Sequence, residues 1–313
     1  MSFKIKVQPN VFDDHFLDII GNEFKFDHVK GQAEWIKNSA DAYTREDISD
    51  ENQYIMLRFI PKSQKELARF ECIDFMGMTK QDVDKAFKRW GDPHAAARGS
   101  GRRVLGGHGN GGKFYMRQMF RRSHFITYRS GKLNVFGFNE NQRYGFAKGF
   151  KDKKVNPDDA IKFAEIYDLD LPLNIRKEIL DGITGFTVAR GIHPDNVTKK
   201  KFNLDKLCEK FKHYPQSRLI LKYKPVLIIY NDKIFNHRLS PEEITPIPEF
   251  GKPMEIAVPQ TIAWEEYGGK ETILLANEKY PPGKLVLCSS CEPLSRNSRL
   301  GDLNRIDITG EIG

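Results

Sequence analysis

The chain has 313 residues, which is enough for two domains of ordinary size or for one large domain with an extension. Apolar residues make up 39% of it and charged residues 29%, and 50 Lys and Arg against 42 Asp and Glu leave a net charge of +8. This balance excludes a collagen-like, a disulfide-rich and a membrane-spanning chain, and it is compatible with an anionic partner without identifying one.

The first part of the chain alternates between helical and strand-like patterns. We expect a helix over about 31–45, in which Trp35, Ile36, Ala40 and Tyr43 are available for packing. The patterns that follow predict strands at 53–60 and 67–74 and a helix at 81–90 capped by Thr79. A glycine-rich basic loop over about 95–112 and a short helix at 113–120 come next. After them we expect strands at 123–129, 132–138 and 143–150, helical structure over 157–181, and a strand at 185–192.

The pattern changes after residue 195, where short strands separated by proline and turn residues dominate. We expect a helix at 202–211 and then strands at 218–223, 226–230, 233–237, 254–258, 272–276 and 284–288. The chain is therefore expected to be α+β, with one domain over 1–194 and a second region over 195–313.

The cysteines and the N-terminus restrict the cellular setting. Four cysteines are too few for a disulfide framework, and the N-terminus has no apolar run suited to a signal peptide, so we expect a cytoplasmic protein without a membrane partner. Cys288 and Cys291 form a single CxxC pair without a second pair of metal ligands, which favours incidental cysteines over a zinc site.

A polar stripe is expected on the first helix. Glu34, Asn38 and Asp41 are spaced so that they share one helical face. A carboxylate can orient or deprotonate a water molecule, and an amide oxygen can bind a hard cation such as Mg²⁺. Taken alone, the stripe is more typical of a solvated helix face.

A second segment places an acidic residue at the end of an apolar strand. Asp74 is followed by Gly77 and by the helix cap. A carboxylate in this position can accept a hydrogen bond from an exocyclic amine, and a nearby glycine allows a flat ring to approach the backbone. A turn with an Asp cap explains the same residues.

The third segment is a glycine loop behind Arg102 and Arg103. Its backbone amides suit an anion, and Lys113 adds a positive charge. Residues 107–113 also fit the GxxxxGK part of a P-loop, but Phe114 stands where Ser or Thr should bind Mg²⁺. A merely flexible loop is the remaining alternative.

Together the three segments resemble the Bergerat-fold ATPases of the GHKL group. The group has a helix with ExxxNxxDA, a strand with DxGxGM and a glycine lid, and here EWIKNSADA, DFMGMT and GGHGNG stand in that order, with a lid similar to the heat-shock-ninety-like and Microrchidia-like members. The resemblance covers about residues 10–195. It departs from the family pattern at Gly77, which follows Asp74 by three residues instead of four.

The resemblance implies a fold and a set of site residues. The fold would be a two-layer sandwich with a mixed, mainly antiparallel sheet and helices on one face, followed by an incomplete transducer-like α+β region. Glu34 would be the general base and Asn38 the Mg²⁺ ligand. The implied residues for binding ATP are Asn38, Asp41, Asp74, Gly77, Met78, Gly106, Gly107, Gly109, Asn110, Gly111, Gly112, Lys113 and Thr187, among which Asp41 supports the helix more than it contacts the nucleotide.

The function implied is Mg²⁺-dependent binding and slow hydrolysis of ATP, which drives lid closure and dimerisation of the chain. The alternative is an ATP-gated binding module that does not hydrolyse, or a nucleic-acid clamp, and the client would be DNA or a protein. Four basic runs are available for phosphate contacts, at 98–103, 117–122, 148–154 and 199–201. We assign the last two to solvated surface, because they are not interleaved with stacking aromatic residues.

Overall fold

The computed structural model describes residues 27–46, 48, 53–64, 67–87, 111–169, 171–194, 203–214, 217, 220, 221 and 224–240, together with four short strands within 254–287. The chain forms two compact units, Met1–Pro241 and Glu242–Gly313. In the second unit β10 (Met254–Ala257) pairs with β13 (Lys284–Leu287), and β11 (Thr261–Ala263) pairs with β12 (Thr272–Leu274), both antiparallel.

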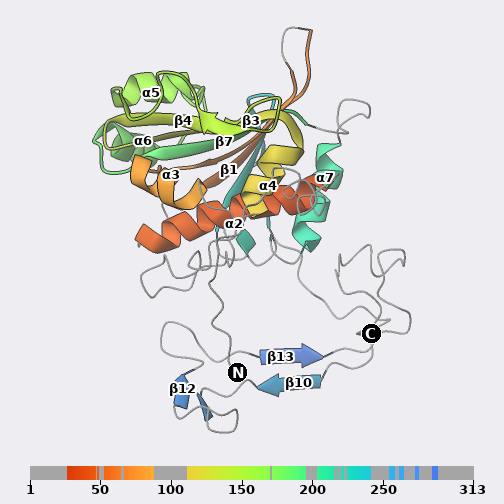
Figure 1. Ribbon diagram of the computed structural model, residues 1–313. Coiled ribbons are helices and arrows are strands. Elements are labelled where there is room, and N and C mark those ends of the chain that lie inside the picture. Colours follow the sequence, from red (N-terminus) through yellow and green to blue (C-terminus); the bar gives the residue numbers. More distant parts are fainter. Residues whose placement is uncertain are drawn as a thin grey trace, which may run out of the picture. The chain divides into compact units, whose positions relative to one another are not determined.

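One nine-stranded sheet runs through the first unit (Figure 1). Its strands are β1 (Ile55–Ile60), β2 (Arg69–Asp74), β3 (Phe120–Arg129), β4 (Lys132–Phe138), β5 (Tyr144–Phe146), β6 (Lys153–Lys154), β7 (Phe186–Pro194), β8 (Val226–Tyr230) and β9 (Lys233–Asn236). The order is β5-β4-β3-β7-β2-β1-β8-β9, with β6 also beside β4. All of these pairs are antiparallel except β1 with β8. The described part of the chain is therefore α+β, as expected.

Six helices accompany the described sheet. They are α2 (His28–Glu46), α3 (Lys80–Phe87), α4 (Gly111–Gln118), α5 (Pro157–Phe163), α6 (Leu173–Leu180) and α7 (Leu204–His213). The expected cap of α3 is confirmed, since the Thr79 amide donates to Asp82 Oδ2 at 2.8 Å and the Asp82 amide donates back to Thr79 Oγ1 at 3.3 Å.

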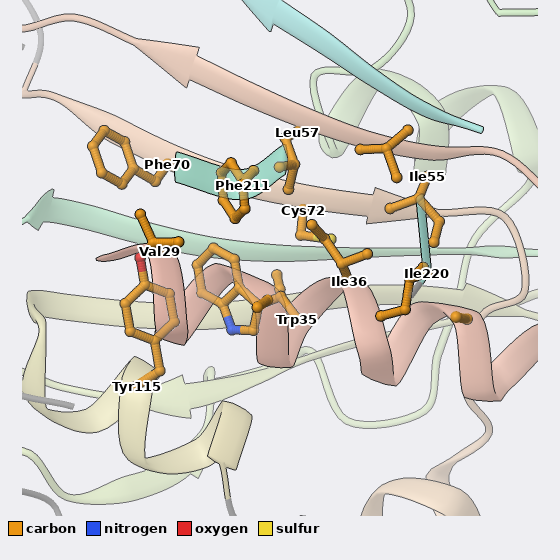
Figure 2. Close-up of a cluster of buried hydrophobic side chains, with 14 of the residues drawn as sticks. Val29, Trp35, Ile36, Ile55, Leu57, Phe70, Cys72, Tyr115, Phe211 and Ile220 are labelled. Atoms are coloured by element: carbon orange, nitrogen blue, oxygen red, sulfur yellow. The ribbon is translucent and has the colours of Figure 1, made fainter. Parts of the chain in front are cut away.

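The sheet buries both of its faces. Along β1, Ile55 and Leu57 face the core that contains α2, α4 and α7, whereas Met56 faces the core that contains α5 and α6. Figure 2 shows the first core, with Trp35 and Ile36 of α2 turned toward the strands. Alternation of side chains along a strand produces this division. The expectation of helices on one face alone is wrong, because α5 and α6 cover the second face (Figure 1).

The first unit extends past the expected boundary at residue 194. Helix α7 adds Leu207 and Phe211 to the core around α2, and β8 pairs with β1 and lies between it and the edge strand β9. The segment expected as a strand at 218–223 is helical at Ile220 and Leu221, which are 2% and 1% exposed. A short apolar run does not distinguish a strand from a buried helical turn, which explains this wrong prediction.

A buried ion-pair network crosses three neighbouring strands. Glu71 of β2 lies between Arg58 of β1 and Arg190 of β7, and its side chain is 0% exposed. Arg58 Nε lies 2.9 Å from Glu71 Oε2, and Arg190 Nε contacts Glu71 Oε1. Both arginines also reach the end of α5, where Arg58 donates to the Glu165 carbonyl and Arg190 donates to the Ala164 carbonyl at 2.9 Å. The network therefore attaches α5 to the sheet.

Candidate functional site

Helix α2 places the first set of expected site residues against the sheet. Glu34 is 8% exposed and Asp41 is 2% exposed, whereas Asn38 is exposed. Lys37 Nζ donates to Glu34 Oε1 at 2.5 Å, so the carboxylate is held on one side by an ammonium group. The three residues thus differ in accessibility, and Asp41 has the burial of a residue that supports the helix.

The start of α4 lies directly on this part of α2. A Cβ atom added at Gly111 would overlap the Glu34 carboxylate, and one added at Gly112 would lie 2.6 Å from Asn38 Nδ2. Tyr115 fixes this approach, because its ring packs 4.7 Å from that of Trp35 and its hydroxyl lies 2.9 Å from His28 Nδ1. The structure therefore brings the first and third motifs into contact through two residues that must lack side chains.

The third motif is only partly a loop. Gly111, Gly112 and Lys113 form the first turn of α4, so the expectation that Gly111 and Gly112 lie in the loop is wrong, whereas Lys113 lies in a helix as the sequence predicts. Lys113 is 4% exposed and is buried with the helix. The remaining expected lid residues, Gly106, Gly107, Gly109 and Asn110, lie outside the described residues.

Asp74 ends β2 in a buried, hydrogen-bonded position. Ser39 of α2 donates from Oγ to Asp74 Oδ2 at 2.9 Å, and the Met76 amide donates to Oδ1 at 3.2 Å. The side chain is buried, and this burial raises the pKa of Asp74 from 3.8 to about 6. Ser39 immediately follows Asn38, so the first and second motifs are also joined through α2.

Threonines continue the polar row beside Asp74. In the strand register Asp74 lies opposite Thr187 of β7, and Thr187 lies opposite Thr127 of β3. The two hydroxyls are 3.0 Å apart, and Thr127 Oγ1 also accepts from the Met78 amide at 2.7 Å. Carboxylate and hydroxyl groups from three adjacent strands thus line one row across the sheet.

Gly77 is required by the backbone. It has φ +74°, and the position of a Cβ atom would overlap the carbonyl oxygen of Tyr128. Glycine adopts this conformation without strain and fits the close approach of β3. The expectation that Gly77 leaves room for a ring is therefore not needed to explain the residue.

Three polar residues of this region were absent from the expected site. Ser39 and Lys37 flank Asn38 in the sequence, and Thr127 lies within an apolar strand. Helical spacing alone places Lys37 one turn from Glu34, which is a usable signal. Nothing in the sequence connects Ser39 with Asp74 or Thr127 with Thr187, because these contacts depend on strand order.

Within the described ranges, no group of three or more His, Cys, Asp or Glu side chains is placed to hold a metal ion. The pair Cys288 and Cys291 lies outside those ranges. None of the helices in the described ranges combines the length and apolar character needed to cross a bilayer.

Burial of Asp74 gives a stability prediction that does not depend on any ligand. A carboxyl group whose pKa is raised on folding favours the protonated state, so its contribution is present below pH 4 and is lost as the pH rises through about 6. Asp74→Asn should therefore stabilise the protein at pH 8 by about 1–3 kcal/mol, because a shift of two units corresponds to roughly 2.7 kcal/mol.

Thermal unfolding at pH 8 and pH 4 checks this prediction. Ser39 is a hydroxyl that can accept from the new amide, so its hydrogen bond is retained. Asp168→Asn, at an exposed position, is the matched control and should leave stability unchanged. A variant at Asp74 that is less stable than wild type at pH 8 contradicts the assigned cost of the buried charge.

Comparison with protein-family models and with curated proteins finds no match to this chain.

Proposed function

We propose that this chain binds ATP with Mg²⁺ and hydrolyses it slowly, at a site formed by α2, the turn after β2 and the start of α4. One observation carries the proposal. Three segments that are far apart in the sequence meet on α2, with Glu34 and Asn38 against Gly111 and Gly112 and with Ser39 on Asp74. The resemblance to the GHKL ATPases rests on the same three segments, and a fold that kept them apart would remove its basis.

The fold agrees with the resemblance in its coarse features. A mainly antiparallel sheet with α2 packed on it is the arrangement that the Bergerat fold implies, and the helices on the second face are an addition to that scheme. We propose that residues 27–194 correspond to the ATP-binding domain. Residues 203–240 complete its sheet and were assigned to the transducer-like region only from the sequence.

The proposed roles follow from accessibility and charge. Asn38 is exposed and carries an amide oxygen suited to Mg²⁺, which when bound would neutralise charge on the phosphates. Asp74 would accept the adenine amine, a role that needs its ionised form. Gly112 lies so close to Asn38 that an added Cβ atom would be 2.6 Å from Asn38 Nδ2, so a side chain at this position would displace the amide. The residues present therefore fit a nucleotide with its metal.

Lys37 restrains the Glu34 side chain. While the Lys37 ammonium group is 2.5 Å from Glu34 Oε1, the carboxylate is engaged in this contact and does not act as a general base. A phosphate group that attracts Lys37 would release Glu34 to orient a water molecule. Such competition accounts for slow turnover without a change in the fold.

Binding of a non-hydrolysable ATP analogue with Mg²⁺, measured by calorimetry at pH 8, tests the proposed function. One site should be filled, and Asp74→Asn should weaken binding at least tenfold because the amide replaces one carboxylate oxygen with an NH₂ group, which cannot accept from the adenine amine. Mass measurement in the same samples reports dimerisation. Absence of binding at millimolar analogue overturns the proposal, and binding with no product in a single-turnover assay favours the non-hydrolysing alternative.

Gly111→Ala should lower ATP turnover by about tenfold. The added methyl group would displace the Glu34 carboxylate or the start of α4, although alanine raises intrinsic helix propensity by about 1 kcal/mol. Steady-state phosphate release measures the effect. The control is Gly145→Ala, where no atom lies near the new Cβ and turnover should be unchanged. Equal turnover of both variants contradicts the contact between α4 and Glu34.

A further inference from the structure

The outer edge of the sheet next to β4 carries a concentrated positive charge. β5 and β6 follow one another along this edge, and the intervening residues 147–152 remain attached to β4 through hydrogen bonds between Val135 and both Ala147 and Phe150. The charge belongs to five lysines: Lys132, Lys148, Lys151, Lys153 and Lys154, all exposed. The edge from β5 to β6 contributes one acidic residue, Asp152, which pairs with Lys132 at 3.5 Å.

Aromatic rings lie beneath these lysines. Lys151 Nζ is 5.1 Å from the centroid of the Phe146 ring, and Lys153 Nζ is 4.5 Å from that of Phe150. The expectation of solvated surface at 148–154 rests on a lack of interleaved aromatic residues, and these two contacts supply such residues.

The aromatic surface continues onto α5. The Phe150 ring stacks on that of Phe163 with centroids 4.8 Å apart, and Phe163 is 41% exposed. Tyr167 is also 41% exposed and has the Arg176 guanidinium 4.6 Å from its ring centroid. Cations therefore lie beside flat rings at the edge of the sheet and again at the end of α5, where Lys162 Nζ is 5.7 Å from the Tyr167 ring centroid.

We propose that this basic–aromatic edge, formed by β5, β6 and the loop between them, binds single-stranded nucleic acid. Ammonium groups match phosphates, and ring faces match unpaired bases, which is the combination that proteins use for single strands. A duplex hides the faces of its bases, and an acidic peptide lacks flat groups that stack on rings. The proposal is independent of the nucleotide site on α2.

Lysines on an edge strand can serve a purpose other than binding nucleic acid, and the test must distinguish the two. They prevent the unpaired edge from joining a strand of another molecule. Protection of the edge requires charge but does not require exposed rings beside the charge. Removal of the rings alone therefore distinguishes the two roles.

Fluorescence anisotropy with a labelled 20-nucleotide oligo(dT), using the full chain without ATP, tests the proposal. The single strand should bind more tightly than a duplex of the same length. The logarithm of the binding constant should fall against that of the salt concentration with a slope near −3, which is about −0.7 for each of four contacted phosphates.

Two variants separate charge from stacking. A triple variant, Lys148→Gln/Lys151→Gln/Lys154→Gln, should weaken binding at least tenfold and reduce the salt slope. Phe150→Leu should weaken binding about fivefold or more and leave the salt slope unchanged. The matched controls are Lys62→Gln/Lys206→Gln/Lys233→Gln and Phe235→Leu, at exposed positions away from this edge, and both should bind as wild type does.

Several results overturn the proposal. These are absence of binding to the single strand at low salt, equal affinity for the duplex, equal losses in the control variants, or unchanged affinity in Phe150→Leu with an intact fold by circular dichroism. If the triple lysine variant aggregates and wild type does not bind the oligonucleotide, the lysines protect the edge of the sheet from pairing with another molecule instead. Binding to anionic vesicles without binding to oligo(dT) also overturns it.

Discussion

Glu34→Gln should bind Mg²⁺ and ATP about as well as wild type and hydrolyse ATP about 1,000-fold more slowly. The substitution keeps the size of the side chain that packs against Gly111 but removes its ability to accept a proton. General bases typically contribute between about 100-fold and 10,000-fold to a rate, and the expected loss lies within that range.

Single-turnover phosphate release and calorimetric binding of the analogue, on the same preparations, separate the two quantities. Lys37→Gln is the informative companion because it removes the ammonium group from Glu34 Oε1 without touching the carboxylate. If Lys37 restrains the base, this second variant should not lose turnover as Glu34→Gln does. Equal hydrolysis by wild type and Glu34→Gln would show that Glu34 is not the base.

Glu71→Ala should lower the free energy of unfolding of the first unit by about 3–5 kcal/mol. Removal of one partner from a buried ion pair leaves an uncompensated charge, and here Arg58 and Arg190 would both lose their shared carboxylate. The variant should also loosen the end of α5, because the same arginines hold the carbonyls of Ala164 and Glu165.

Urea unfolding followed by circular dichroism measures this loss. The control, Asp232→Asn, removes a charge from a side chain that is 61% exposed and lies 3.7 Å from Arg58, and Asn tolerates the positive φ of this position, so its effect should stay below about 1 kcal/mol. A loss for Glu71→Ala no larger than that of the control would mean that the buried network contributes little to stability.

The sequence predicted local structure better than the arrangement of the layers. The strands expected at 53–60 and 132–138 correspond to β1 and β4, and the first helix begins only three residues before the expected start. Apolar periodicity and capping residues act over a few positions in the chain, so elements that depend on them can be predicted from the sequence. The placement of α5 on the second face involves Arg58 and Arg190, which bond to carbonyls at its end that lie far away in the sequence. The placement of α6 follows from burial of Ile175 and Ile179 in the same core.

The candidate site shows the same division. Glu34 and Asn38 could be predicted because helical spacing puts them on one face, and Gly111 and Gly112 could be predicted as part of a glycine run. Ser39 could not be predicted, because its contact with Asp74 depends on how α2 packs on β2. Gly111 and Gly112, which begin α4, were expected in the loop because glycine has a low helix propensity. Their contacts with α2 supply the stability instead.

The pairing of β1 with β8 has a consequence for how the protein is made and cut. Ile55 pairs with Val226, so during synthesis the apolar edge of β1 has no partner strand until nearly the whole first unit has left the ribosome. A fragment that ends at residue 194 would keep that edge exposed and should aggregate, whereas one that ends at residue 241 retains β8 and β9 as its cover. Recombinant production of the first unit should therefore take the later end point.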